Sequence, residues 1–389
     1  MDAGESAEEE LSTEECMSLI DEMKAMGTEM LILTGGEPLL RRDIYDIASK
    51  ASSLGMWVVM GTNGVLVNEH VAQKMVDCGV KGVGISIDSV DPEKHNAFRG
   101  GPNAWKYSVR ALEICRDHGL EVLVQSSIMQ ENREELRDLL EFAKSKNAWS
   151  FNLYFLVKTG RGMELSDLSA EETEQCIREM IEYQSDFEPM FIRAKCAPQF
   201  KQLSYEMGRG GLESGGCMAG TEYCRITPEG NVTPCPYMDV VAGNVRNEGF
   251  TEVWKASEVL LNLRDTYKLK GRCGSCEFNE LCGGCRCRAY SATGDYLAED
   301  PACRYQPGTM EAPSMLDVAF SDPVAARLDK IPIEFIRGKV RKGLIAYASR
   351  HGLRIITESD MDKAMAGASK RSFASMAGSS LFKPHTPES

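Results

Sequence analysis

The chain has 389 residues, 43% of them hydrophobic, and 44 Lys and Arg against 58 Asp and Glu give a formal net charge of −14. This length suggests two or three domains, and the hydrophobic fraction allows a globular core. The negative charge argues against nucleic acid as the main partner, because such binding depends on basic patches. No run approaches the roughly 18 apolar residues of a transmembrane helix, and the acidic N-terminus has no apolar signal region. We therefore expect a cytoplasmic protein with no membrane partner.

In the first half of the chain, short apolar runs alternate with helical patterns. The runs predict strands at Met30–Leu33, Trp57–Thr62, Gly82–Ile87, Glu121–Ser126 and Phe151–Phe155. The helical patterns lie at Leu11–Met26, Arg42–Leu54, Asn68–Cys78, Ala104–His118 and Arg133–Lys146. Repeated strand–helix units predict a parallel sheet with helices outside it. The pattern fits a partial barrel and an open doubly wound sheet equally well, and it ends near residue 190.

A glycine-rich motif, Thr34-Gly35-Gly36-Glu37-Pro38, directly follows the first predicted strand. Glycines let the backbone come close to a ligand. The carboxylate of Glu37 stands at the carboxyl end of a strand, where parallel α/β folds place their active sites. By itself, the motif could also be a simple turn between a strand and a helix.

This motif and the next two strand ends together resemble the radical S-adenosylmethionine (radical SAM) enzymes. Leu33–Leu40 is similar to the family's segment for the amino group of S-adenosylmethionine, and Thr62-Asn63-Gly64 and Ser86-Ile87-Asp88 match the following strand ends. The resemblance implies that S-adenosylmethionine is held by Gly35, Gly36, Glu37, Asn63, Ser86 and Asp88. His95 and Arg99, a few residues further on, could equally fix the loop.

The chain departs from the family at its N-terminus. The defining cysteine triplet, C-x3-C-x2-C, which holds a 4Fe–4S cluster in the family, occurs nowhere in the sequence. In relatives the triplet precedes a segment like Glu10–Glu15 by a dozen or so residues, whereas nine residues precede it here. The resemblance therefore implies an α/β fold, an incomplete radical SAM partial (β/α)6 barrel lacking its first strand, in a chain that is inactive as given. The alternative is a natural protein that has lost radical chemistry.

Fourteen cysteines are many for a cytoplasmic protein, in which clustered cysteines more often bind metal than form disulfides. Nine of them crowd into residues 217–303. Four others fall in helical patterns and are expected to be small packed hydrophobes, namely Cys16, Cys78, Cys115 and Cys176. Cys196 stands between the two sets, and its role as a ligand or a substrate contact stays open.

The spacing of the crowded cysteines resembles the SPASM domain, which holds auxiliary 4Fe–4S clusters in many radical SAM enzymes. The resemblance implies one or two clusters, one held by Cys217, Cys224, Cys235 and Cys285, and the other by Cys273, Cys276, Cys282 and Cys303. The family's last spacing is x3 where this chain has x2, so Cys287 is an alternative to Cys285. Paired C-x2-C knuckles also occur in zinc ribbons, so the residues alone leave zinc open.

These features divide the chain into four parts. We expect the partial barrel at 1–200, a small iron–sulfur domain organised around its ligands at 201–308, a short helical domain at 309–366 and a disordered tail at 367–389. The helical domain, with Phe335-Ile336-Arg337 and Arg350-His351-Gly352, resembles the C-terminal segment of a light-independent protochlorophyllide reductase subunit.

Three stretches narrow the resemblance to the tetrapyrrole-modifying branch, closest to the heme synthase type: Phe155–Gly162, Lys195–Pro198, and Cys282–Tyr290 with its continuation to Asp300–Cys303. In the complete enzyme this implies decarboxylation of iron-coproporphyrin III propionates to vinyl groups, with an electron donor such as ferredoxin or flavodoxin. Lys158 and Arg161 are candidates for holding the substrate carboxylates, since Arg pairs well with a carboxylate. Two alternatives remain, a radical SAM maturase of a peptide or enzyme, and a non-catalytic iron–sulfur electron carrier or tetrapyrrole-binding protein.

Overall fold

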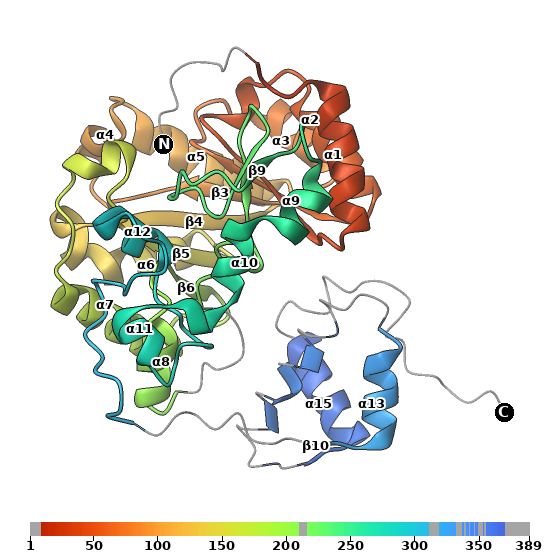
Figure 1. Cartoon of the computed structure of the whole chain (residues 1–389). Helices are drawn as coiled ribbons and strands as arrows, with labels where there is room; N and C mark the ends of the chain where they lie inside the picture. Colours follow the sequence, from red (N-terminus) through yellow and green to blue (C-terminus); the bar gives the residue numbers. More distant parts are fainter. Residues whose placement is uncertain are drawn as a thin grey trace. The chain divides into compact units, whose positions relative to one another are not determined.

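The computed structural model describes residues 9–209, 216–310, 319–331, 337, 340–341, 343–345, 347–348, 353 and 355–369. The chain forms two compact units, one of Met1–Arg209 with Gly215–Met310 and the other of Gly210–Ser214 with Glu311–Ser389. The first unit thus holds both the strand–helix repeats and the cysteine-rich region (Figure 1). The predicted tail lies outside the described residues from residue 370 onward.

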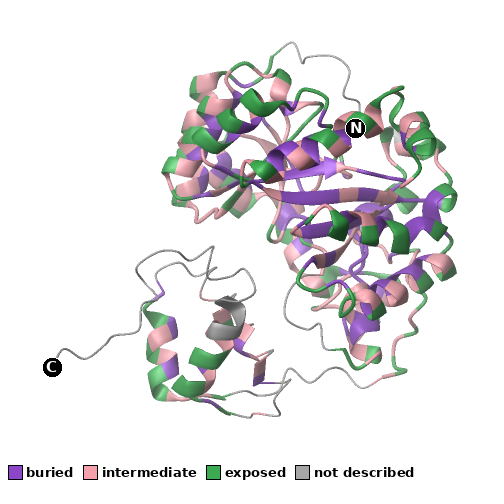
Figure 2. Cartoon of the chain, turned by 180° about the vertical axis from the view of Figure 1, so that it is seen from behind, coloured by how far each residue is buried: buried purple, intermediate pink, exposed green. Residues whose placement is uncertain are grey.

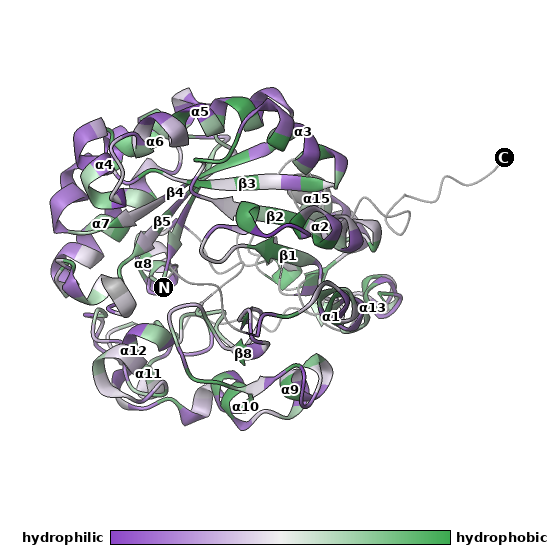
Figure 3. Cartoon of the chain, turned by 90° about the horizontal axis from the view of Figure 1, so that it is seen from above, coloured by the Kyte–Doolittle hydropathy of each residue, from purple (hydrophilic) through white to green (hydrophobic). Residues whose placement is uncertain are grey.

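Six parallel strands, in sequential order, form a sheet that curls into a half-barrel (Figures 1 and 3). They are β1 (Met30–Leu33), β2 (Trp57–Thr62), β3 (Val80–Ser86), β4 (Glu121–Ile128), β5 (Ser150–Phe155) and β6 (Phe191–Lys195). The five predicted strands are confirmed to within two residues at each end. The sixth strand, β6, was not predicted, and the prediction that the alternation ends near residue 190 is wrong.

Helices cover the convex side of the half-barrel (Figure 3). They are α1 (Thr13–Ala25), α2 (Ile44–Ser53), α3 (Glu69–Asp77), α4 (Pro92–Arg99), α5 (Ala104–Asp117), α6 (Leu136–Ser145), α7 (Ala170–Tyr183) and α8 (Phe200–Glu206). Short 3-10 turns accompany them at η1 (Pro38–Leu40), η2 (Gln130–Glu135) and η3 (Gly160–Glu164). A capping box between Ser12 and Glu15 starts α1, because each side chain accepts a hydrogen bond from the backbone N–H of the other residue.

The strands alternate between two chemically different faces. Alternate residues, such as Val124 of β4 and Leu153 of β5, join the helices in one apolar core, which appears as the buried centre of the unit in Figure 2. Successive side chains of a strand point to opposite faces. The residues between them, such as Gln125 and Asn152, therefore line the concave inner face. Three of the four scattered cysteines, Cys78, Cys115 and Cys176, are buried in the core, as predicted for packed hydrophobes.

The cysteine-rich region has little regular structure. An antiparallel sheet of three short strands comprises β7 (Arg225–Ile226), β8 (Asn231–Thr233) and β9 (Gly243–Asn244). Around it lie α9 (Phe250–Ala256), α10 (Glu258–Arg264), η4 (Thr266–Lys268), α11 (Gly271–Ser275) and α12 (Arg286–Thr293). These elements lie toward the open side of the half-barrel (Figure 3).

Direct contacts join this region to the first helix of the barrel. The carboxylate of Glu22 accepts hydrogen bonds from the backbone N–H groups of Phe250 (3.0 Å) and Thr251 (2.7 Å). Arg246 donates to Glu15 at 2.6 Å, in an ion pair between the two regions. We call these contacts the α1 seam.

The second unit has its own small core, described here by itself. It contains α13 (Asp322–Asp329) and α15 (Glu358–Ser369), together with a parallel strand pair of β10 (Ala319–Phe320) and β11 (Ile355–Ile356). Val324, Leu328 and Met361 are buried in its core. The strand pair was not predicted. Within the described residues, no helix of either unit is long and apolar enough to cross a membrane.

Candidate active site and cysteine groups

Glu37 is fixed at the carboxyl edge of the sheet by the neighbouring strand. One carboxylate oxygen accepts hydrogen bonds from the Thr62 hydroxyl (2.8 Å) and the backbone N–H of Leu39 (3.2 Å), and the other accepts from the N–H of Asn63 (2.9 Å). Gly35 has a φ of +146°, a backbone conformation that favours glycine. The structure therefore brings Gly35, Glu37 and Asn63 together at the ends of β1 and β2, with Gly36 between them in sequence.

Asp88 lies at the next strand end, and its carboxylate is already engaged. It forms an ion pair with Arg99 at 2.5 Å and accepts from the N–H of Ser127 at 2.9 Å, and only 2% of its side chain is exposed. Buried His95 accepts at Nδ1 from the N–H of Asp88 at 3.2 Å. These contacts favour the loop-fixing role for His95 and Arg99. Ser86, the last residue of β3, is half-buried on the inner face.

The inner face of β5 and β6 carries basic and polar groups that sequence reasoning missed. Tyr154 stands opposite Lys195, and Asn152 stands opposite Arg193, in the parallel register of these strands. Burial, and then the nearby Arg193, lowers the pKa of Lys195 to about 8. The Arg193 guanidinium lies 5.1 Å from the centre of the Trp149 ring. In the described part of the chain, no carboxylate forms an ion pair with Arg193 or Lys195, so two desolvated cations share this face.

The other two candidates for binding substrate carboxylates lie in the loop after β5. Lys158 is exposed, and its backbone carbonyl accepts a hydrogen bond from Ser291 at 2.5 Å. Arg161 belongs to η3, and its side chain lies outside the described part of the structure. Their roles in binding remain predictions.

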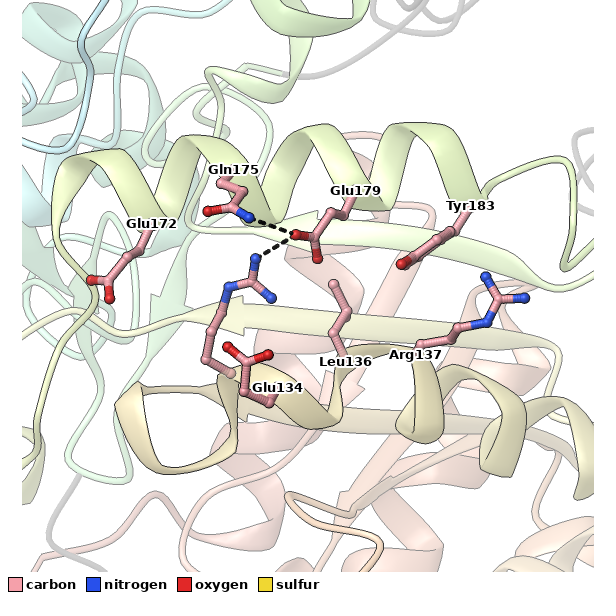
Figure 4. A pocket seen from close by; sticks show the side chains of 8 residues that line it. Glu134, Leu136, Arg137, Glu172, Gln175, Glu179 and Tyr183 are labelled. Atoms are coloured by element: carbon pink, nitrogen blue, oxygen red, sulfur yellow. Dashed lines mark hydrogen bonds and ion pairs between the residues drawn. The ribbon is translucent and has the colours of Figure 1, made fainter.

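A pocket on the outer side of the barrel has a different character (Figure 4). It lies between α7 and the η2–α6 segment and is lined by Arg133, Glu134, Leu136, Arg137, Glu172, Gln175, Glu179 and Tyr183. Arg133 forms an ion pair with Glu179 at 2.6 Å, and Arg137 lies over the Tyr183 ring. Because these charges already have partners, the pocket is a weaker candidate for a binding site than the inner face.

One set of cysteines, which we call the second cysteine group, comes from a single stretch of chain: Cys273, Cys276, Cys282 and Cys303. Backbone N–H groups point at three of its sulfur atoms. Asp300 donates to the Cys273 Sγ (3.5 Å), Phe278 to that of Cys276 (3.4 Å) and Gly284 to that of Cys282 (3.5 Å). Hydrogen bonds to sulfur stabilise thiolates and tune iron–sulfur clusters. This loop therefore suits a cluster.

A further set, the first cysteine group, gathers where the barrel meets the cysteine-rich region: Cys196, Cys217, Cys235, Cys285 and Cys287. Four of these residues, Cys196, Cys235, Cys285 and Cys287, pack in one small cluster, close enough for their thiols to interact. Cys217 lies close enough to Cys285 and Cys235 for their charges to interact. Three of the four residues predicted for this cluster are therefore together, with Cys196 and Cys287 beside them.

Cys224, the fourth residue predicted for this cluster, lies in a different environment. It packs against the apolar core of the barrel. Burial raises the pKa of its thiol to about 12, and the only charge that opposes this rise in the described residues is that of Arg264.

Buried Asp300 links the two cysteine groups, a role that sequence analysis did not predict for it. Its carboxylate accepts from the N–H of Cys285 at 2.7 Å and pairs with Arg288 at 3.4 Å, while its own N–H points at Cys273. The side chain of Asp300 has no exposed surface. Asp300 lies 15 residues from Cys285, 12 from Arg288 and 27 from Cys273, so no short sequence motif predicts these contacts.

In the described residues, no three His, Cys, Asp or Glu side chains form a group that could hold a single metal ion. A 4Fe–4S cluster requires a wider arrangement of ligands, because its four thiolates bind four separate iron atoms. The two cysteine groups, with their N–H donors and glycine turns, suit such a cluster.

The comparisons with known proteins agree with this architecture. The model of the radical SAM superfamily matches residues 3–143, and that of the SPASM iron–sulfur cluster-binding domain matches residues 217–286. The AdoMet-dependent heme synthase of Methanosarcina barkeri is 38% identical over 311 residues, which cover 77% of this chain and 89% of the relative. The pre-heme d1 synthase of Dinoroseobacter shibae is 30% identical and covers 76% of this chain and 78% of the relative. Streptococcus suis SuiB, solved with S-adenosylmethionine, matches with a TM-score of 0.60 and 15% identity, covering 74% of this chain and 69% of SuiB.

The chain therefore belongs to the radical SAM enzyme family. More particularly, it is a member with a SPASM domain, and its cofactors are S-adenosylmethionine and 4Fe–4S clusters. The zinc alternative is set aside by the match to an iron–sulfur domain.

Proposed function

We propose that this chain is a radical SAM enzyme of heme biosynthesis that converts propionate side chains of iron-coproporphyrin III into vinyl groups. The observation that carries the proposal is the 38% identity to a heme synthase across 89% of that relative. The basic inner face of β5 and β6 adds support, because the proposed substrate carries several carboxylates.

The reaction converts a saturated acid side chain into an alkene. When bound, the cofactors supply a 5′-deoxyadenosyl radical, which takes one hydrogen atom from the propionate carbon attached to the ring. Loss of carbon dioxide and one electron from the side chain then forms the vinyl double bond, so the balance requires a one-electron acceptor. The protein supplies orientation and a site that excludes water.

We propose that the strand ends hold S-adenosylmethionine. Glu37 is the best-placed anion for the amino group, because Thr62 and Asn63 fix both of its oxygen atoms. Gly35 and Gly36 would let the cofactor approach the backbone, and Asn63 and Ser86 would contact it from the next strand ends. Asp88 would act by holding the loop, since Arg99 and Ser127 already occupy its carboxylate.

We propose that Arg193 and Lys195 bind substrate carboxylates, with Lys158 and Arg161 as further contacts from the loop after β5. A desolvated cation without a carboxylate partner gains most from an anionic ligand. Titration of the reconstituted chain with iron-coproporphyrin III, followed by porphyrin absorbance, tests this. Arg193→Met and Lys195→Met should each weaken binding about tenfold, as expected for loss of one charged contact of about 1.4 kcal/mol.

Two controls sharpen the titration. Arg137→Met removes a cation from the outer pocket and should leave binding unchanged. The methyl ester of the porphyrin, which lacks free carboxylates, should bind weakly to the unaltered chain. Equal binding of acid and ester would contradict carboxylate recognition.

Turnover needs a separate experiment, because the sequence contains no C-x3-C-x2-C triplet. We would extend the chain at its N-terminus with a strand and such a triplet, and follow the substrate by mass spectrometry. Loss of carbon dioxide and two hydrogens per propionate is the expected result. Cleavage of S-adenosylmethionine with an unchanged porphyrin would contradict the proposed substrate and favour a peptide maturase, in line with 26% identity to a PqqA peptide cyclase.

A further inference from the structure

The first cysteine group contains one thiol from outside the cysteine-rich region. Cys196 directly follows β6, the last strand of the half-barrel, whereas Cys217, Cys235, Cys285 and Cys287 belong to the domain that follows. Cys196 and Cys285 nevertheless pack in one small cluster. A 4Fe–4S cluster needs four thiolates. Five cysteine thiols are present at this site.

The backbone at Cys196 adopts an unusual conformation. Its φ is +59°, and in the described residues Asn147 is the one other non-glycine residue with a positive φ. This conformation costs about 1 kcal/mol or more for a residue with a side chain, and such outliers concentrate at functional sites. Arg288 helps to hold it by donating to the Cys196 carbonyl at 2.9 Å and to that of Leu156 at 3.3 Å. Cys196, held in this conformation, packs in the same small cluster as Cys235 and Cys285.

Cys224 lacks these features, although the spacing resemblance makes it a ligand. It contributes to the apolar core of the barrel, whereas Cys196, Cys235 and Cys285 share a separate cluster. In the described part of the chain, no other cysteine is among the groups that act on the Cys224 thiol. For the fourth ligand of this cluster, sequence spacing therefore favours Cys224, whereas the spatial arrangement favours Cys196.

We propose that Cys196 is a ligand of the auxiliary 4Fe–4S cluster in the first cysteine group, together with Cys217, Cys235 and Cys285, in place of Cys224. Each thiol gives up its proton as it binds iron. Cys287 stays a thiol and donates a hydrogen bond to the sulfur of Cys285. This ligand set bonds the cluster directly to the last strand of the barrel, two residues beyond Ala194 and beside the inner-face residues Tyr154 and Lys195.

The test compares single-thiol variants of the full 389-residue chain. Because the sequence has no C-x3-C-x2-C triplet, iron bound after anaerobic reconstitution reports the auxiliary sites. The unaltered chain should bind about eight irons, as two four-iron clusters do. Cys196→Ser should lose about four irons, or change the electron paramagnetic resonance signal of one cluster to that of a three-iron form.

Three matched variants make the result decisive. Cys224→Ser and Cys287→Ser should keep the iron content and both resonance signals, and Cys303→Ser should lose the signal that Cys196→Ser retains. Normal signals from Cys196→Ser, or loss of a cluster from Cys224→Ser, would overturn the assignment.

Two further variants guard against misfolding. Cys196→Asp places an oxygen ligand at the same position, and it should keep a four-iron cluster with a shifted resonance signal. An added small thiol should also restore the original signal to Cys196→Ala. An unshifted signal from Cys196→Asp, together with no response of Cys196→Ala to the thiol, would contradict direct ligation.

Discussion

The two cysteine groups differ in how the chain assembles them. The second cysteine group comes from one loop-rich stretch, and N–H groups of that same stretch point at its sulfur atoms. The first cysteine group draws on the residue after β6, on the segments before β7 and after β8, and on the start of α12. A local group is set by spacing along the sequence, whereas a composite group depends on how two domains pack. Two sites for the same kind of cofactor can therefore differ in how much their assembly depends on the packing of distant segments.

The largest expected effect comes from removing a ligand of the local group. Cys282→Ser should lose about four irons and sharply lower the thermal stability of the cysteine-rich region, because such a domain folds around its metal. Iron analysis and a thermal melt measure both effects. Cys16→Ser is the control, since Cys16 is a residue of α1 that packs against the barrel core and belongs to neither group. Equal iron in Cys282→Ser and the unaltered chain would remove Cys282 from the ligand set.

Gly284→Ala should damage the second cysteine group through geometry alone. Gly284 has a φ of +64°, and an added Cβ would lie 2.7 Å from the Cys273 sulfur and 2.6 Å from the Arg286 guanidinium. Iron content should fall toward that of Cys282→Ser. Gly294→Ala is the matched control, because φ is +76° there but no atom lies within 4 Å of the new Cβ. It should cost about 1 kcal/mol of stability and no iron. Equal iron loss in both variants would mean that backbone strain, and not the contact with sulfur, is responsible.

Arg288→Gln should act on the composite group. Arg288 joins the Cys196 and Leu156 carbonyls to Asp300, whose side chain has no exposed surface. Burial by itself would lower the pKa of Arg288, but the negative charges of Asp300 and of other nearby groups together outweigh it, so the net shift is upward and the guanidinium stays charged. Removing one partner of a buried pair costs about 3 kcal/mol.

Denaturant unfolding and the two cluster signals measure this effect. The first cluster's signal should weaken while the second remains. Lys270→Gln, which breaks the exposed pair with Asp295, should cost less than about 1 kcal/mol and change neither signal. Loss of both signals in Arg288→Gln would mean that the two groups fold as one. That result would contradict the distinction between a local and a composite group.

Sequence reasoning succeeded where local pattern carries the information. Apolar runs such as Trp57–Thr62 predicted the strands. The glycines before Glu37 predicted a binding site at the end of β1, where Thr62 and Asn63 hold the Glu37 carboxylate. It missed β6 because Arg193 and Lys195 interrupt a run of only five residues, and their inner-face positions are visible only in the folded sheet.

The unpredicted parts of the site are those that depend on contacts distant in sequence. Cys196 and Cys285 are far apart along the chain, so no spacing rule connects them. Asp88 matched a cofactor motif by position, but its carboxylate is occupied by Arg99 and Ser127. Residue type and spacing predicted the class of cofactor. Only the folded structure shows which individual residues lie together at each site.

The smallest expected effect lies at the α1 seam. The Glu22 carboxylate caps α9 from another helix, because Gly249 at its N-cap position has no side chain to do so. Burial raises the pKa of Glu22, but hydrogen bonds from Thr251 and Phe250 outweigh it, and the net shift is downward from 4.5. The stabilisation is therefore present above the unfolded-state pKa and is lost as the pH falls through the lower folded-state value.

Glu22→Gln should cost about 1 kcal/mol at neutral pH and progressively less in acid, with both cluster signals intact. Thermal melts across the acid range measure this, with Asp21→Asn, at an exposed pair with Lys50, as the control. A change in either cluster signal would mean that this seam helps to assemble the cysteine groups, and the composite group would then depend on both ends of the barrel.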